Sequence, residues 1–208
     1  MKMNGKRVIE VIGKINEKID SKKEYLTELD AAIGDGDHGL NMSKGFNAVL
    51  DKLKDDDGSN IGNIFKKTGM ALVSSVGGAS GPLYGTAFMK GSMMVNNKDN
   101  IDIYDFINVL KVALDGIKQR GKSTEGEKTM IDALQPAINA MEEELKNSNN
   151  PKIILEKGKD AAKKGVDFTK EIKATKGRAS YLGNRSIGHQ DAGATSMYYI
   201  LETIYEEI

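Results

Sequence analysis

The feature that most constrains the fold is the spacing of the apolar residues, which recur at intervals of three and four along nearly the whole chain. In an α-helix this spacing gathers side chains on one face, so each such segment has to pack against another helix. The sequence has only three prolines, so few residues oppose helix formation. We therefore predict an all-α fold built from eight helical segments within the 208 residues.

The boundaries of these segments follow from turn formers and capping residues. Asp102 is a typical N-cap, and Pro136 is expected to kink the helix that contains it. We find no internal repeat, no low-complexity tract and no interdomain linker, so residues 1–208 are predicted to form one domain. The expected helices cover residues 8–30, 40–53, 61–76, 82–95, 102–117, 130–145, 151–174 and 197–205.

Composition narrows the classes of function. Hydrophobic residues make up 39% of the chain, enough to build a core. Thirty basic and thirty acidic residues give no net charge, which argues against a nucleic-acid-binding protein. The absence of cysteine excludes disulfides and thiolate metal sites. The first residues lead into an amphipathic helix rather than a signal peptide, and no apolar run approaches membrane-spanning length, so we expect a soluble cytoplasmic protein.

An acidic, glycine-rich loop is the strongest candidate site. Carboxylates this close repel one another, which makes a divalent cation their natural partner. The loop is expected to join two helices, and the amino terminus of the second favours phosphate because its N–H groups are unpaired. A metal and a phosphate can therefore share this place. The aspartates and glycines concerned are Asp30, Gly34, Asp35, Gly36, Asp37 and Gly39.

Three familiar sequence motifs match by residue identity alone, because the expected structure around each of them does not fit. Residues 34–39 fit G-x-G-x-x-G, but a dinucleotide site needs a preceding strand and here the preceding segment is helical. A calcium-binding EF-hand counted from Asp35 would have Phe46 where it needs glutamate. Residues 116–123 spell a P-loop, yet they follow a helical run and do not open a helix.

Several motifs taken together resemble the nucleotide-binding L subunit of dihydroxyacetone kinase. The resemblance extends over nearly the whole chain, in the order in which that family carries its motifs. It implies eight antiparallel helices arranged as a barrel-like bundle, with the nucleotide bound at one end by the loops. The matching motifs are 34–39 with Asn41, 77–81, 120–122, 128–130, and 177–183 through 189–191.

The resemblance also implies which residues bind ligands. Asp30, Asp35 and Asp37 would hold two Mg²⁺ ions, and these ions would hold the diphosphate of ADP or ATP. No residue is assigned as catalytic. Gly121 and Met130 would line the adenine pocket. The full set of expected nucleotide contacts is His38, Gly39, Leu40, Asn41, Ala79, Ser80, Gly121, Met130, Arg178, Asp191, Ala192 and Gly193.

This chain departs from the family at one of those positions. Ala192 stands where the family usually has proline, so the loop loses a fixed φ angle and is expected to be looser. The effect should be modest, because proline brings no ligand atom that alanine lacks. His38 and His189 are the only histidines, and we expect structural roles for both rather than a phosphohistidine intermediate.

The resemblance implies that this chain is half of an enzyme, one subunit that acts together with another. Dihydroxyacetone would be held on a separate K subunit, and the Mg-nucleotide would pass a phosphoryl group to it. In one mode ADP stays bound and is recharged by a phosphohistidine protein of the phosphotransferase system, the M subunit. In the alternative mode ATP exchanges at every turnover. A free-standing L chain favours the first mode, and a homodimer is a further assembly to be considered.

Rival functions from other classes remain open at this point. A non-enzymatic metal-binding module would keep the aspartates but would not need Ser80 or Arg178. A regulatory partner of a transcription factor or kinase would tolerate loss of Asp35. A related kinase acting on another ketose, polyol or sugar is the nearest enzymatic rival, because the acceptor would be chosen outside this chain.

Overall fold

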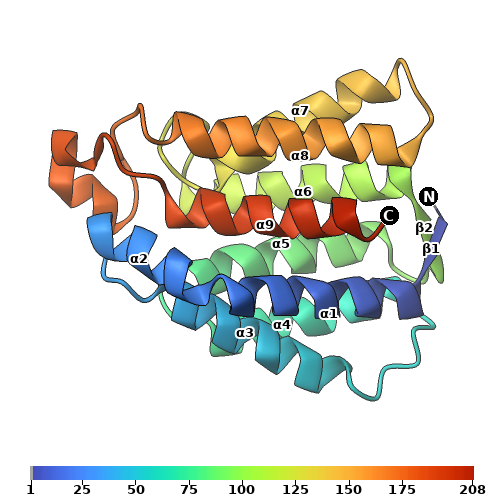
Figure 1. Ribbon diagram of the computed structural model, residues 1–208. Helices are drawn as coiled ribbons and strands as arrows, with labels where there is room; N and C mark the ends of the chain where they lie inside the picture. Colours follow the sequence, from blue (N-terminus) through green and yellow to red (C-terminus); the bar gives the residue numbers. More distant parts are fainter. Residues whose placement is uncertain (1) are drawn as a thin grey trace.

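The computed structural model describes residues 2–208, and in these residues the predicted all-α class is confirmed (Figure 1). Most helices are amphipathic, with apolar faces that are buried and charged faces that are exposed, whereas the helix at 80–94 carries small and apolar residues on all sides. Their bounds are α1 Gly5–Ser21, α2 Lys23–Ile33, α3 His38–Leu53, α4 Ile61–Ser75, α5 Ser80–Met94, α6 Ile103–Gly121, α7 Ile131–Leu145, α8 Pro151–Phe168 and α9 Ala192–Glu206, with a short 3₁₀ element η1 at Arg178–Ser186.

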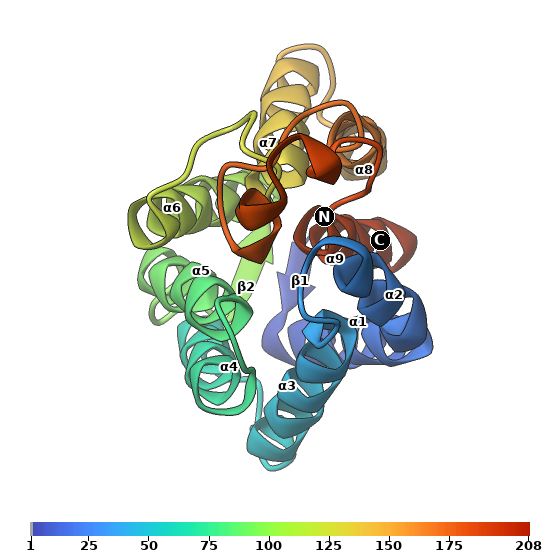
Figure 2. The same cartoon turned by 90° about the vertical axis from the view of Figure 1, so that its left-hand side faces the viewer.

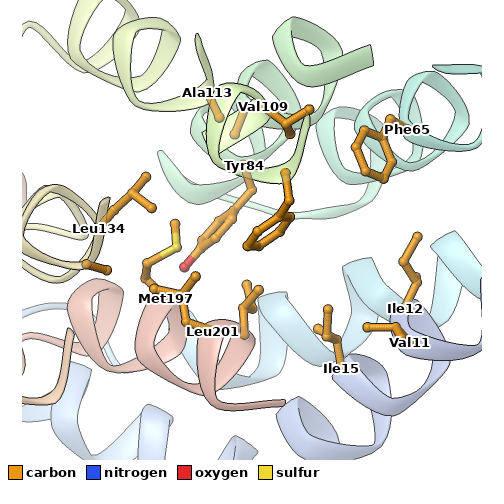
Figure 3. Packing of buried hydrophobic residues seen from close by; sticks show 14 of the residues in the cluster. Val11, Ile12, Ile15, Phe65, Tyr84, Val109, Ala113, Leu134, Met197 and Leu201 are labelled. Atoms are coloured by element: carbon orange, nitrogen blue, oxygen red, sulfur yellow. The ribbon is translucent and has the colours of Figure 1, made fainter. Parts of the chain in front are cut away.

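The long helices contact one another in a closed circuit. From α3 onward each packs against the next in sequence, α1 packs against α3, and α9 returns to pack against α1 (Figure 2). The helix α2 lies outside this ring, beside α3 and α9. Apolar side chains from opposite sides meet in the interior and leave an apolar cavity of about 110 Å³ between them; they include Tyr84, Val109, Met197 and Leu201 (Figure 3). Burial of these side chains is the main force that holds the ring together.

The first predicted helix, 8–30, is wrong in one respect, because the structure divides it into α1 and α2. The backbone of Lys22 leaves the helical region with φ −107° and ψ 7°. The Ser21 hydroxyl donates to the Lys18 carbonyl at 2.8 Å, a local bond that competes with helix continuation. Apolar residues continue at helical spacing on both sides of this break, so their periodicity does not reveal it.

Three other predictions of helix length are corrected. The helix expected over 102–117 continues to Gly121. The helix expected over 151–174 ends at Phe168, and the carbonyls of Thr169 and Ile172 turn instead toward the ammonium of Lys128. The last helix begins at Ala192 rather than at 197, because Asp191 caps it. The predicted cap at Asp102 is confirmed as a capping box.

Some features lack a sequence pattern long enough to predict them. Strand β1, Lys2–Asn4, pairs antiparallel with β2, Asn100–Asp102, at one end of the ring.

Pro136 lies inside α7 without ending it. Among the described residues, no helix combines the length and apolar character needed to cross a membrane.

Candidate functional site

A cavity of about 540 Å³ opens at the end of the ring opposite the small sheet. Figure 2 looks onto this end, where the connections between helices gather. Four of these connections supply most of the lining, although they are far apart in the sequence. They are the α2–α3, α4–α5, α6–α7 and α8–α9 connections.

The predicted metal ligands come together at one side of this cavity. One carboxylate oxygen from each of Asp30, Asp35 and Asp37 lies within 4.8 Å of the others. Asp30 Oδ2 accepts the backbone N–H groups of Asp37 at 2.9 Å and His38 at 3.2 Å, so the start of α3 fixes its orientation. Gly36 makes the turn possible with φ +71°. Three oxygen donors without nitrogen or sulfur suit a hard cation such as Mg²⁺.

A cationic side chain from η1 reaches this cluster. Arg178 Nε pairs with Asp35 Oδ2 at 2.7 Å, with side chains 66% and 37% exposed, respectively. A pair this exposed contributes little to stability. Its effect is to place a guanidinium beside the aspartate cluster, where an anion bound to a metal ion in that cluster would lie.

His38 is a buried part of the cavity lining, and both of its ring nitrogens are paired. Nδ1 lies 3.1 Å from Ser80 Oγ, and Nε2 lies 2.8 Å from Ser196 Oγ. The Tyr84 hydroxyl lies 2.8 Å from the same Ser196 oxygen. Burial lowers the pKa of His38, although Asp30 and Asp37 oppose this effect. The imidazole is therefore held in place, with neither nitrogen free to attack a phosphoryl group, and it positions Ser80 in the lining.

The other side of the cavity is apolar. Leu83, Ile117, Met130 and Ile131 line it together with Gly121. A Cβ atom at Gly121 would lie 3.3 Å from Leu83 Cδ2, so a larger residue would narrow the space. Apolar walls of this kind suit a purine ring.

Asp191 closes the cavity between these two sides. It is partly exposed to the cavity, and its carboxylate accepts the N–H of Ala194 at 2.7 Å as the cap of α9. Burial raises the pKa of Asp191 to about 7, against the lowering effects of the Ala194 N–H and of Lys128. Ala192 and Gly193 follow it in the lining.

The structure brings nearly all the predicted site residues to this one cavity. The exceptions are Gly39 and Leu40, which do not line it. Leu40 is 56% exposed, and Gly39 packs so closely on the Lys23 carbonyl that no Cβ would fit. His189 is exposed and lies outside the lining.

Sequence reasoning missed one residue of the lining that is buried and charged. Lys128 is only 2% exposed, and it appeared above only as part of a motif, without a role. Nothing in its local sequence indicates burial, because its partners are backbone carbonyls more than forty positions away.

Comparison with known proteins identifies the family of this chain. Residues 32–206 match the DAK2 domain family. The chain is 46% identical over 180 residues to the ADP-binding subunit of PEP-dependent dihydroxyacetone kinase 1 of Listeria innocua, covering 86% of this chain and 85% of that one. It is 38% identical over 204 residues to the corresponding Escherichia coli subunit, covering 98% and 97%.

The fold is shared with a solved kinase. The dihydroxyacetone kinase of C. freundii superposes with a TM-score of 0.76 at 25% identity, over 97% of this chain and 34% of that one. This chain thus spans about a third of that kinase. The sequence match and the shared fold lead to one conclusion: this chain belongs to the DAK2 domain family, together with the ADP-binding subunits of bacterial dihydroxyacetone kinases.

Proposed function

We propose that this chain is the ADP-binding subunit of a dihydroxyacetone kinase. The observation that carries the proposal is the joint arrangement of three carboxylates within 4.8 Å and an apolar wall in one cavity of about 540 Å³. A nucleoside diphosphate with Mg²⁺ has the matching parts, an anionic metal-bound end and a flat apolar end. The bacterial relatives are named as ADP-binding subunits, which supports the same ligand.

Each side of the cavity would then bind a different part of the Mg-nucleotide. Asp30, Asp35 and Asp37 would hold two Mg²⁺ ions, which supply positive charge to the phosphate oxygens. Asn41 and Ser80 would donate to the phosphates, with Ser80 oriented by His38. Arg178, which lies beside Asp35, would add positive charge. Gly121 and Met130 would contact the purine, while Asp191, Ala192 and Gly193 close the cavity beside them.

The chemistry is phosphoryl transfer through this nucleotide. In the recharging step a phosphohistidine of the donor M subunit would transfer its phosphoryl group to the terminal phosphate oxygen of ADP, with its P–N bond broken. In the second step a hydroxyl of dihydroxyacetone on the K subunit would take this phosphoryl group and lose its proton, and ADP would remain. Positioning and charge neutralisation account for most of the rate in such reactions. The relatives are named as PEP-dependent, which supports this donor.

Reconstitution tests the proposal. The purified chain is combined with a K subunit and dihydroxyacetone, with either a PEP-driven phosphotransferase system or ATP as donor, and product is measured. Transfer from PEP with ADP retained in native mass spectrometry supports the coenzyme mode. Transfer only from added ATP supports the exchanging mode.

A matched pair of variants makes this test specific. Asp37→Asn should abolish transfer, whereas Asp55→Asn, at an exposed position in the connection after α3, should transfer like the wild type. Normal transfer by Asp37→Asn would show that the proposed site is wrong.

A further inference from the structure

Lys128 has an unusual environment for a lysine. It is 2% exposed and forms no ion pair among the described residues. Its Nζ donates to three backbone carbonyls, Thr169 at 2.5 Å, Ser186 at 2.7 Å and Ile172 at 3.3 Å. An ammonium has three donors, so all of them are used. Burial lowers the pKa of Lys128, while Asp191 and Asp132 favour its charged form.

The three carbonyls belong to one segment, the connection between α8 and α9, which we call the 169–191 strap. A connection of this length with only a 3₁₀ element inside it is uncommon in a compact fold, so something must order it. Lys128 joins its beginning, at Thr169 and Ile172, to its later part, at Ser186. The Gly188 N–H donates to the Lys170 carbonyl at 2.7 Å and closes the same loop. The ammonium lies at the centre of these contacts.

The backbone of Lys128 supports the same interpretation. Its φ of +63° is in the left-handed region, which is costly for a residue that has a Cβ atom. Neighbouring bonds hold this conformation, because Asp132 accepts the N–H of Gly126 at 2.5 Å and that of Thr129 at 2.7 Å. A strained backbone that aims one side chain into a set of carbonyls indicates that the side chain is required there.

The strap carries residues of the proposed site. Arg178 lies on it and pairs with Asp35 at 2.7 Å. Its last residue, Asp191, donates its backbone N–H to the Thr169 hydroxyl at 3.0 Å, next to the carbonyl that Lys128 holds. The position of Arg178 therefore depends on the strap, and the folded strap depends on the ammonium.

We infer that Lys128 is a positioning residue that orders the 169–191 strap and thereby places Arg178 at the phosphate end of the cavity. This inference rests on the proposed function for the role of Arg178, whereas the ordering of the strap stands independently. Lys128 acts through the strap and is not assigned a contact with the reacting atoms.

The first test is Lys128→Met, which keeps the aliphatic stem and removes all three donors. Hydrogen exchange and trypsin cleavage at Lys176, Arg178 and Arg185 should become faster, while exchange in the ring helices stays unchanged. Lys152→Met is the matched control, because the Lys152 Nζ donates to a single carbonyl, that of Tyr205 at 2.6 Å, away from the strap. The control should leave the strap protected.

The second test uses the affinity for Mg·ADP. Loss of a supporting residue typically weakens binding by about 10- to 100-fold, and we expect this for Lys128→Met. In an Arg178→Gln background the same change should have little further effect, because both variants remove the placement of one guanidinium. Lys128→Gln keeps one donor group, so its affinity for Mg·ADP should lie between those of the wild type and Lys128→Met. This variant replaces Lys128→Met in the test if the methionine variant does not fold.

The outcomes separate this inference from the proposed function. Unchanged strap exchange in Lys128→Met or Lys128→Gln would overturn the ordering role. Additive losses of affinity in the double variant would overturn the link to Arg178. If the wild-type chain did not bind Mg·ADP, the proposed function and the role assigned to Arg178 would both fail, while hydrogen exchange would still decide whether Lys128 orders the strap.

Discussion

Replacing Asp191 by asparagine should stabilise the ligand-free protein far more at alkaline pH than at acidic pH. The pKa of Asp191 is raised from 3.8 to about 7, mainly by burial. Because the folded state holds this proton more tightly than the unfolded state, the wild type loses stability as the pH rises from about 4 to 7 and then levels off. Asparagine has no charge to bury and is still a good cap for α9.

The size of the effect follows from the shift in pKa. A change from 3.8 to about 7 corresponds to at most roughly 4 kcal/mol at pH 8. Asp191 is partly exposed to the cavity, so water screens part of this, and we expect about 2 kcal/mol. That gain raises the melting temperature by roughly 4–8 °C in a protein of this size.

Thermal unfolding without nucleotide or Mg²⁺, measured at pH 4.5 and pH 8, checks this expectation. Asp191→Asn should gain stability at pH 8 and gain only about a quarter as much at pH 4.5. Asp55→Asn, on the exposed connection after α3, controls for the general effect of removing one negative charge. An equal gain at both pH values, or a loss at pH 8, would refute the reasoning.

Three further predictions follow from the packing. Gly39→Ala places a methyl group against the Lys23 carbonyl and should destabilise the protein by about 1–3 kcal/mol in urea unfolding, and unchanged stability would contradict this contact. Leu72→Ala removes a fully buried side chain and should cost about 2–5 kcal/mol in the same assay, well above any loss from an exposed position. Arg178→Gln frees Asp35, so calorimetry with Mg²⁺ alone should show binding up to about fivefold tighter, and weaker Mg²⁺ binding would argue against competition between the two cations.

Helices were predictable from the sequence because their apolar faces are encoded locally. The segments beginning at Ile61 and Pro151 carry both the periodicity and a capping asparagine, so their starts were found within a residue. The break at Lys22 was not found, because the same spacing continues on both sides of it. The pairing of β1 with β2 depends on contacts about a hundred positions apart, which no local pattern records.

The residues of the candidate site also differ in how far the sequence alone could predict them. Asp30, Asp35 and Asp37 were found because their chemistry is concentrated in one stretch of sequence. The hydroxyl of Ser196 behind His38 gave no such signal, since it approaches from α9 only in the folded chain. Lys128 was assigned no role for a similar reason: its partners are carbonyls, which every residue has. Residues that position others are recognised from the folded structure.

The central claim is that the three aspartates bind Mg²⁺ and that this metal binds the diphosphate. Isothermal calorimetry of ADP binding, with Mg²⁺ and then with a chelator, tests it most directly on the wild type and on Asp35→Asn. We expect heat of binding from the wild type only when Mg²⁺ is present, and a large loss of affinity in Asp35→Asn with helix content unchanged. Equal ADP affinity with and without Mg²⁺, or normal binding by the variant, would contradict the account.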